Sequence, residues 1–237
     1  MQEPDHRKRR KTEVFTGFLV LLTTFGFIVA ILLDFNFVSP YATLNEDLSF
    51  LMDHYNTQRI SSYAWLSAAV LTFITIPFYQ LTFKGRLKFL HHIATIFILA
   101  AGIGFFLSGW LGLKFSDSVN SILANNLSLT EEHVRLQLLG EFHEKQYFKR
   151  MAGISLGGLA ILLGLTRFWV KRFPLLSSFL LILAGPVLIY YNWNESDHIL
   201  RTTAIAAIAA GIIVFCIKLI CSGLSPGKGK KMASSGQ

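Results

Sequence analysis

Histidine and glutamate side chains gather in one charged stretch in the second half of the chain. His133 and His143 share it with Glu132, Glu141 and Glu144. Imidazole nitrogens and carboxylate oxygens can together bind a divalent metal ion. On a helix, however, Glu141 and Glu144 are only three residues apart, whereas His133 lies further along and around the axis. We treat His133, Glu141, His143 and Glu144 as candidate metal ligands, against the simpler interpretation of a solvated helix face.

The rest of the sequence offers little support for catalysis. It contains no nucleophile elbow, zinc-protease motif, phosphate-binding loop or dinucleotide fingerprint. No ionisable side chain lies near the middle of any apolar stretch, where it would cost about 2.5–3.5 kcal/mol and usually mark a transport path. His91 and His92 follow basic residues and are interpreted as interfacial side chains. We therefore expect no catalytic residue, no cofactor, and no transport of protons or charged substrates.

The elements that would position these side chains are membrane-spanning helices. Apolar residues make up 52% of the chain and charged residues only 15%, against about 25% charged in soluble domains. Apolar stretches of about 20 residues can cross a hydrocarbon layer about 30 Å thick. We predict an all-α fold with six spans, at residues 14–33, 63–83, 89–113, 151–166, 174–191 and 202–221. They form one membrane domain, between a basic tail at 1–13 and a disordered basic tail at 222–237.

The charge pattern between the spans predicts their orientation. The two tails, with the adjoining Lys218, and the turns after spans two and four hold 15 of the 22 Lys and Arg residues but only 3 of the 14 acidic residues. Cytoplasmic loops accumulate Lys and Arg, so both termini are predicted to be cytoplasmic, in an inner or plasma membrane. The net charge of +8 then reflects topology and anionic lipid headgroups rather than nucleic acid binding. Trp65, Trp110 and Trp193 are predicted at the outer interface, in an aromatic belt.

Two long segments on the outer side carry signals for amphipathic helices. Capping boxes at Thr43–Glu46 and Ser128–Glu131 are each followed by apolar residues at helical spacing. Glu141 and Lys145 form an i,i+4 pair that suits an exposed helix face. The second of these helices is able to continue into span four. We predict short amphipathic helices in both segments, lying over the mouth of the bundle.

Small residues recur where the spans are expected to touch. Such residues let helix backbones approach closely in a membrane, and their usual role is packing within one chain. They include Ala100, Gly104, Ser108 and Gly112 in span three, Gly153, Gly157 and Gly164 in span four, and Ala207 and Gly211 in span six.

The layout of the whole chain resembles that of small six-helix bacterial integral membrane proteins of an uncharacterised family. The shared features are the long segment 34–62, the basic turn Lys84–Arg86, the small residues within 102–112, the basic turn 167–174 and Gly185. The resemblance covers most of the chain and rests on layout rather than on a motif. It implies a six-helix membrane fold and no particular activity.

Three hypotheses for function follow from the sequence. The first is a non-enzymatic accessory or scaffold subunit that lies in the lipid bilayer and binds another membrane protein or a second copy of itself. The second is a carrier or binder of a neutral lipid-like molecule, with Pro77 and Pro186 as flexible points. The third is a metal-dependent membrane enzyme that uses the outer histidines and glutamates.

Overall fold

The computed structural model of the chain describes residues 3–35, 54–82, 88–125, 132–166, 174–194 and 198–224. Within these ranges the protein consists of six long helices and no strands. They are α1 Glu3–Phe35, α3 Tyr55–Thr82, α4 Lys88–Ala124, α5 Glu132–Leu165, α6 Leu175–Asn194 and α7 His198–Leu224. Each is long and apolar enough to cross a membrane, so the predicted all-α fold with six candidate spans is confirmed. Both capping boxes, Thr43–Glu46 and Ser128–Glu131, and most of the C-terminal tail lie outside the described residues.

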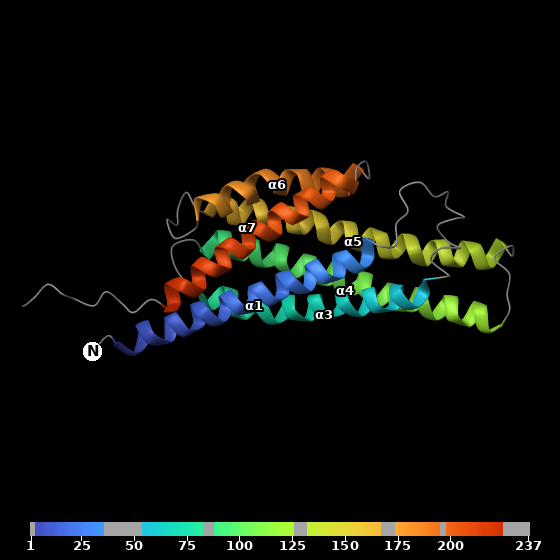
Figure 1. The fold of residues 1–237 in the computed structure, drawn as a ribbon, viewed down its shortest axis with the longest axis horizontal. Helices are drawn as coiled ribbons and strands as arrows, with labels where there is room; N and C mark the ends of the chain where they lie inside the picture. The colour runs from blue at the N-terminus through green and yellow to red at the C-terminus, as the bar shows by residue number, and fades with distance from the viewer. Residues whose placement is uncertain are drawn as a thin grey trace, which may run out of the picture.

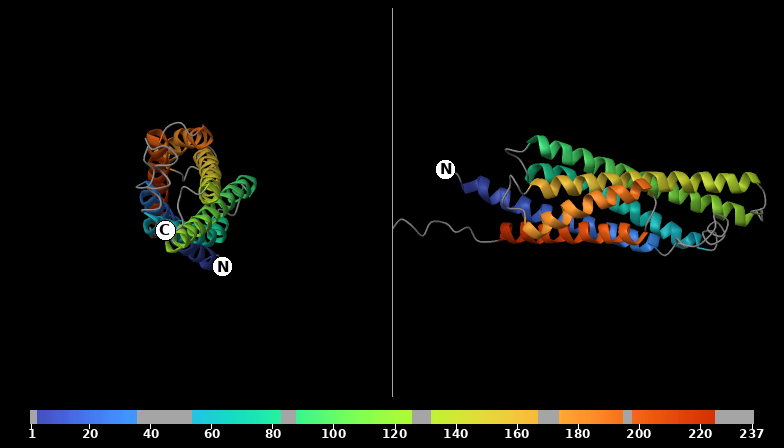
Figure 2. Two further views of the ribbon diagram at one scale, coloured as in Figure 1. Left: turned by 90° about the vertical axis from the view of Figure 1, so that its right-hand side faces the viewer. Right: turned by 90° about the horizontal axis from the view of Figure 1, so that it is seen from above.

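The six helices form a closed ring. Each helix packs against its neighbours in chain order, and α7 returns to pack against α1, as the view along the bundle in Figure 2 shows. At this closure Gly17 of α1 lies against Ile220 of α7. The start of α1 and the end of α7 lie at the same end of the bundle (Figure 1). We call it the terminal end, and the opposite one the distal end.

The helices differ in length, and the difference appears at the distal end. α6 has 20 residues, a length of about 30 Å, whereas α4 has 37, a length of about 55 Å. Figure 1 shows α3, α4 and α5 extending past α1, α6 and α7. We call residues 55–62, 109–124 and 132–149 of these three helices the distal extension.

The second amphipathic segment is part of this extension. It forms the first half of α5, which runs without a break from Glu132 to Leu165. The segment continues into span four, as the sequence allowed, and projects along the bundle axis instead of lying over the mouth of the bundle (Figure 1). Continuous helix is favoured here because no Pro interrupts the residues between Glu132 and the apolar span.

Glycine contacts hold α5 and α6 together. A Cβ atom on Gly157 would lie 2.7 Å from the carbonyl oxygen of Gly185, and a Cβ on Gly185 would lie 2.7 Å from that of Gly157. Gly153 lies against the side chain of Asn192, and Gly164 against Ile182. The prediction that small residues mark contacts within the chain is confirmed for these positions.

Most buried hydroxyl groups in the bundle bond the backbone of their own helix. Thr72 Oγ1 donates to the carbonyl of Ala68 at 2.8 Å, one turn back. Several hydroxyl groups also link different helices. Thr23 of α1 and Thr75 of α3 have their Oγ1 atoms 3.1 Å apart, and Ser177 Oγ of α6 donates to the Gly211 carbonyl of α7 at 2.7 Å.

The distal extension has an apolar core of its own. It is a cluster of buried side chains from α4 and α5, with Tyr55 of α3 packed against it. The buried members are Phe115, Val119, Ile122, Val134 and Leu138. A separate core lets these helix ends pack together without lipid around them.

Candidate functional site

Charged and polar side chains are buried between the apolar core of the distal extension and the membrane bundle. Lys145 of α5 is 1% exposed and Glu141 is 6% exposed, and Gln58 of α3 is also buried. The prediction that Glu141 and Lys145 form an exposed pair is therefore wrong. Both continue the stripe of Val134 and Leu138 at spacings of three and four, so they share the buried face of α5.

Gly112 of α4 makes room for the Lys145 side chain. A Cβ atom on Gly112 would lie 3.4 Å from Lys145 Cε and would clash with Ser62 Oγ of α3. An alanine at this position would therefore displace Ser62 and would lie in van der Waals contact with Lys145. The missing side chain on α4 allows Lys145 and Ser62 to approach each other from α5 and α3.

A second lysine of α5 lies one turn further toward the bundle. Lys149 Nζ is 5.8 Å from the ring centroid of Trp65, within the range of a cation–π interaction. Trp65 stacks on Phe105, with centroids 4.8 Å apart, and is only 1% exposed. The predicted interface position of Trp65 is therefore wrong, because its ring faces α4 and not lipid. Trp110 and Trp193 are exposed, as an aromatic belt requires.

Glu141 is held by α4 and by its own helix. Its Oε1 atom is 3.4 Å from Lys114 Nζ and accepts hydrogen bonds from Ser118 Oγ at 3.2 Å and Gln137 Nε2 at 3.5 Å. Its Oε2 atom is buried without a hydrogen-bond partner among the described residues, and so is Gln58 Nε2. An unmatched buried acceptor or donor costs about 1–3 kcal/mol, so this part of the fold is held together at some expense in stability.

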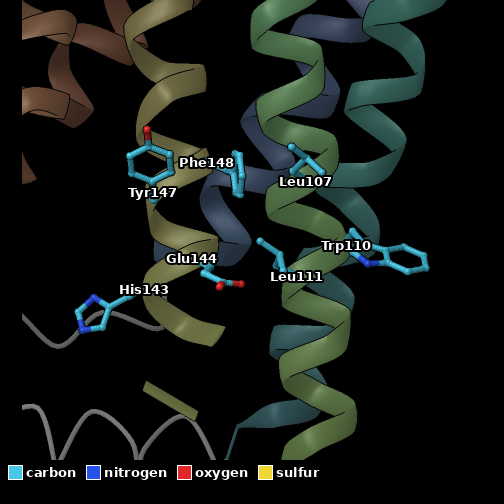
Figure 3. Close-up of a pocket in the computed structure, with 7 residues that line it drawn as sticks. All are labelled: Leu107, Trp110, Leu111, His143, Glu144, Tyr147 and Phe148. Carbon is cyan, nitrogen blue, oxygen red and sulfur yellow. The ribbon is translucent and has the colours of Figure 1, made fainter. Parts of the chain in front are cut away.

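The four candidate metal ligands are placed in different surroundings. Glu141 is buried beside a lysine, whereas His133, His143 and Glu144 are exposed. Figure 3 shows His143 pointing away from α4 and Glu144 pointing toward it. Among the described residues, no group of three or more His, Cys, Asp or Glu side chains could hold a metal ion.

His91 makes a contact that its interfacial interpretation did not include. Its Nδ1 atom lies 3.2 Å from the hydroxyl of Tyr79, a buried side chain of α3. The rings meet edge to face, with centroids 5.8 Å apart. His92 is exposed, as expected. His91 therefore joins α4 to α3 near the terminal end.

A groove of about 570 Å³ runs between α4 and α5 on the surface of the protein. Phe148 and Leu107 face each other across it, and Glu144 is directed into it beside Leu111 (Figure 3). The lining residues are Leu107, Trp110, Leu111, His143, Glu144, Tyr147 and Phe148. We call it the α4/α5 groove. It combines an apolar floor with one carboxylate, which suits an amphiphilic ligand.

The spacing of residues along each helix predicts which side chains share the face that lines this groove. Leu107, Leu111 and Lys114 share one face of α4 at i, i+4 and i+7, and Glu141, Glu144 and Phe148 share one face of α5. Reading either helix alone does not show that these two faces meet. The ion pair between Lys114 and Glu141 joins the two faces beyond the distal end of the groove.

Comparisons with protein-family models, with curated proteins and with solved structures gave no match.

Proposed function

We propose that this chain is a non-enzymatic multi-pass membrane protein that binds another membrane protein through its distal extension. The observation that supports this proposal is the projection of α4 and α5 beyond the other helices (Figure 1). α6 matches the thickness of the hydrocarbon layer, whereas α4 exceeds it by about 25 Å at 1.5 Å per residue. The excess emerges at the distal end and offers a surface outside the lipid.

Apolar side chains on this surface provide anchors for a partner. Leu136 of α5 is 60% exposed, and Leu123 of α4 and Ile60 of α3 are also exposed. The same extension carries charged side chains such as Arg59 and Asp117, which approach each other to 3.9 Å. Protein–protein interfaces combine apolar anchors with polar side chains.

The orientation of the protein is part of the same proposal. The basic segments support a cytoplasmic terminal end and an external distal extension, with the protein in an inner or plasma membrane. Single cysteines test it in a Cys216→Ala, Cys221→Ser background. Asn125→Cys should react with a membrane-impermeant maleimide in intact cells, and Ser222→Cys only after permeabilisation. The reverse labelling pattern would contradict the proposed orientation.

Photocrosslinking tests partner binding directly. A photoreactive amino acid at Leu136 should crosslink the protein at native expression to a second protein, identified by mass spectrometry after purification in a gentle detergent. The matched control is Leu183 of α6, which is 54% exposed on an apolar span, where lipid is the expected neighbour. Recovery of the protein alone and monomeric, with no protein adduct at Leu136, would overturn the proposal.

The same pair of positions gives a binding test without crosslinking. Leu136→Ala should reduce the amount of co-purified partner, because it truncates an exposed anchor of the distal extension. Leu183→Ala removes a similar exposed area and should leave the partner bound. Equal loss in both variants would indicate a general effect on the membrane bundle instead.

A further inference from the structure

The α4/α5 groove is bordered by the kinds of side chain found where lipid headgroups meet acyl chains. Toward the terminal end α4 and α5 carry further exposed apolar side chains, and beyond the distal end Lys114 pairs with Glu141. These exposed apolar side chains are Ile96, Leu99, Ile103 and Phe106 of α4 and Met151 of α5. Trp110 and Tyr147 are each 58% exposed beside the groove, and such side chains prefer the membrane interface.

Glu144 gives the groove a negative charge available to a ligand. Its side chain is exposed and directed toward α4 (Figure 3). No described residue forms a hydrogen bond or ion pair with its carboxylate. A carboxylate at the edge of an apolar surface attracts a cationic group and disfavours an anionic one.

Lys114 follows Leu111 by about one turn of α4, beyond the distal end of the groove, and is not one of its lining residues. Its ammonium pairs with the buried Glu141. Glu144 is therefore the charged side chain within the groove that can bind a headgroup.

A lipid amine held at Glu144 leaves its acyl chain beside the apolar side chains on the terminal side of the groove. We propose that the α4/α5 groove binds a phospholipid with a primary-amine headgroup, whose ammonium contacts Glu144 and whose acyl chain lies along Leu107 and Phe148. Phosphatidylethanolamine has this chemistry. Its ammonium can donate hydrogen bonds to a carboxylate, which a choline headgroup cannot do.

The aromatic residues argue against choline as well. Quaternary ammonium groups are usually bound inside cages of aromatic faces. Figure 3 shows Trp110 directed outward on the α4 side and Tyr147 on the far side of α5. They therefore flank the groove without forming a cage over Glu144.

Native mass spectrometry of the full chain in detergent tests this proposal. The protein is mixed with equal amounts of phosphatidylethanolamine, phosphatidylcholine and phosphatidylglycerol that carry the same acyl chains. We expect phosphatidylethanolamine to be retained several-fold more than either other lipid. In Glu144→Gln this preference should be lost, because the charge-assisted contact with the ammonium is removed.

Glu132→Gln is the matched control, because Glu132 is an exposed glutamate at the start of the same helix. It should retain the wild-type preference, and an unchanged unfolding temperature should show that Glu144→Gln is folded. Equal binding of the three lipids by the wild type, or equal preference in the wild type and Glu144→Gln, would overturn the proposal. Equal retention of phosphatidylcholine and phosphatidylethanolamine would overturn the assignment of a primary amine.

Discussion

The two halves of α5 bury opposite kinds of side chain against their neighbours. The half in the distal extension buries Glu141 and Lys145, and the half in the bundle buries Gly153, Gly157 and Gly164. In lipid the hydrophobic effect does not drive helices together, so contact depends on close backbone approach. In the proposed position of the distal extension outside lipid, apolar burial supplies the driving force and can offset the cost of buried charges. One helix therefore follows two sets of packing rules along its length.

The largest expected effect is in the charged half. Lys145→Ala should lower the free energy of unfolding by about 3 kcal/mol, because it removes a buried ammonium and leaves a cavity beside Gly112. Unfolding in mixed detergent micelles, followed by tryptophan fluorescence, measures the change. Lys145→Met keeps the packed aliphatic part of the side chain and should lower the free energy of unfolding by about half as much. Arg135→Ala is the exposed control, and an equal effect of Lys145→Ala and Arg135→Ala would contradict the buried position.

The second largest effect on stability is expected in the half of α5 that lies in the bundle. Gly157→Ala should destabilise the protein by about 2 kcal/mol, because its Cβ would force α5 and α6 apart at the Gly185 carbonyl. The same unfolding measurement applies. Retention of wild-type stability would show that the two helices are not in close contact there.

Replacing another glycine of the same helix by alanine should change the free energy of unfolding in the opposite direction. Gly140 is exposed, and a Cβ built on it meets nothing within 4 Å. Gly140→Ala should therefore raise the free energy of unfolding by about 0.8 kcal/mol through helix propensity alone. Comparison with Gly157→Ala separates backbone approach from propensity. A loss of stability in Gly140→Ala would indicate a contact that the structure does not contain.

The smallest effect concerns the hydroxyl pair between α1 and α3. Thr75→Val should lower the free energy of unfolding by only about 0.6 kcal/mol. The hydroxyls of Thr23 and Thr75 also lie 2.8 Å from a carbonyl oxygen of their own helix. Because each hydroxyl has one proton, the bond between the helices competes with these bonds. A double-mutant cycle with Thr23→Val measures the coupling. A coupling above about 2 kcal/mol would make this hydrogen bond a main support of the bundle.

The sequence was sufficient for the six helices and for their glycine contacts, since both depend on local composition and spacing. The sequence also contains a pattern that predicts the burial of Lys145, because this residue continues the stripe of Val134 and Leu138. The i,i+4 pair of charges predicts an exposed face instead, and that prediction is wrong. Trp65 was assigned by its depth in the membrane, although Ser61, Ser62 and Ala69 share its helix face and are buried with it. The ion pair of Lys114 with Glu141 depends on how two helices meet, which one helix cannot reveal.

The contact between α7 and α1 has a consequence for how this protein can associate. A row of helices has two outermost members, and each offers an open side onto which another helix can be added. A ring has no outermost member, so every helix here already has both neighbours. A second protein therefore has to bind across the outer surface or at the distal extension. The order of the helices around the ring also stays the same wherever the chain begins, so the N-terminal helix has no special place in the architecture.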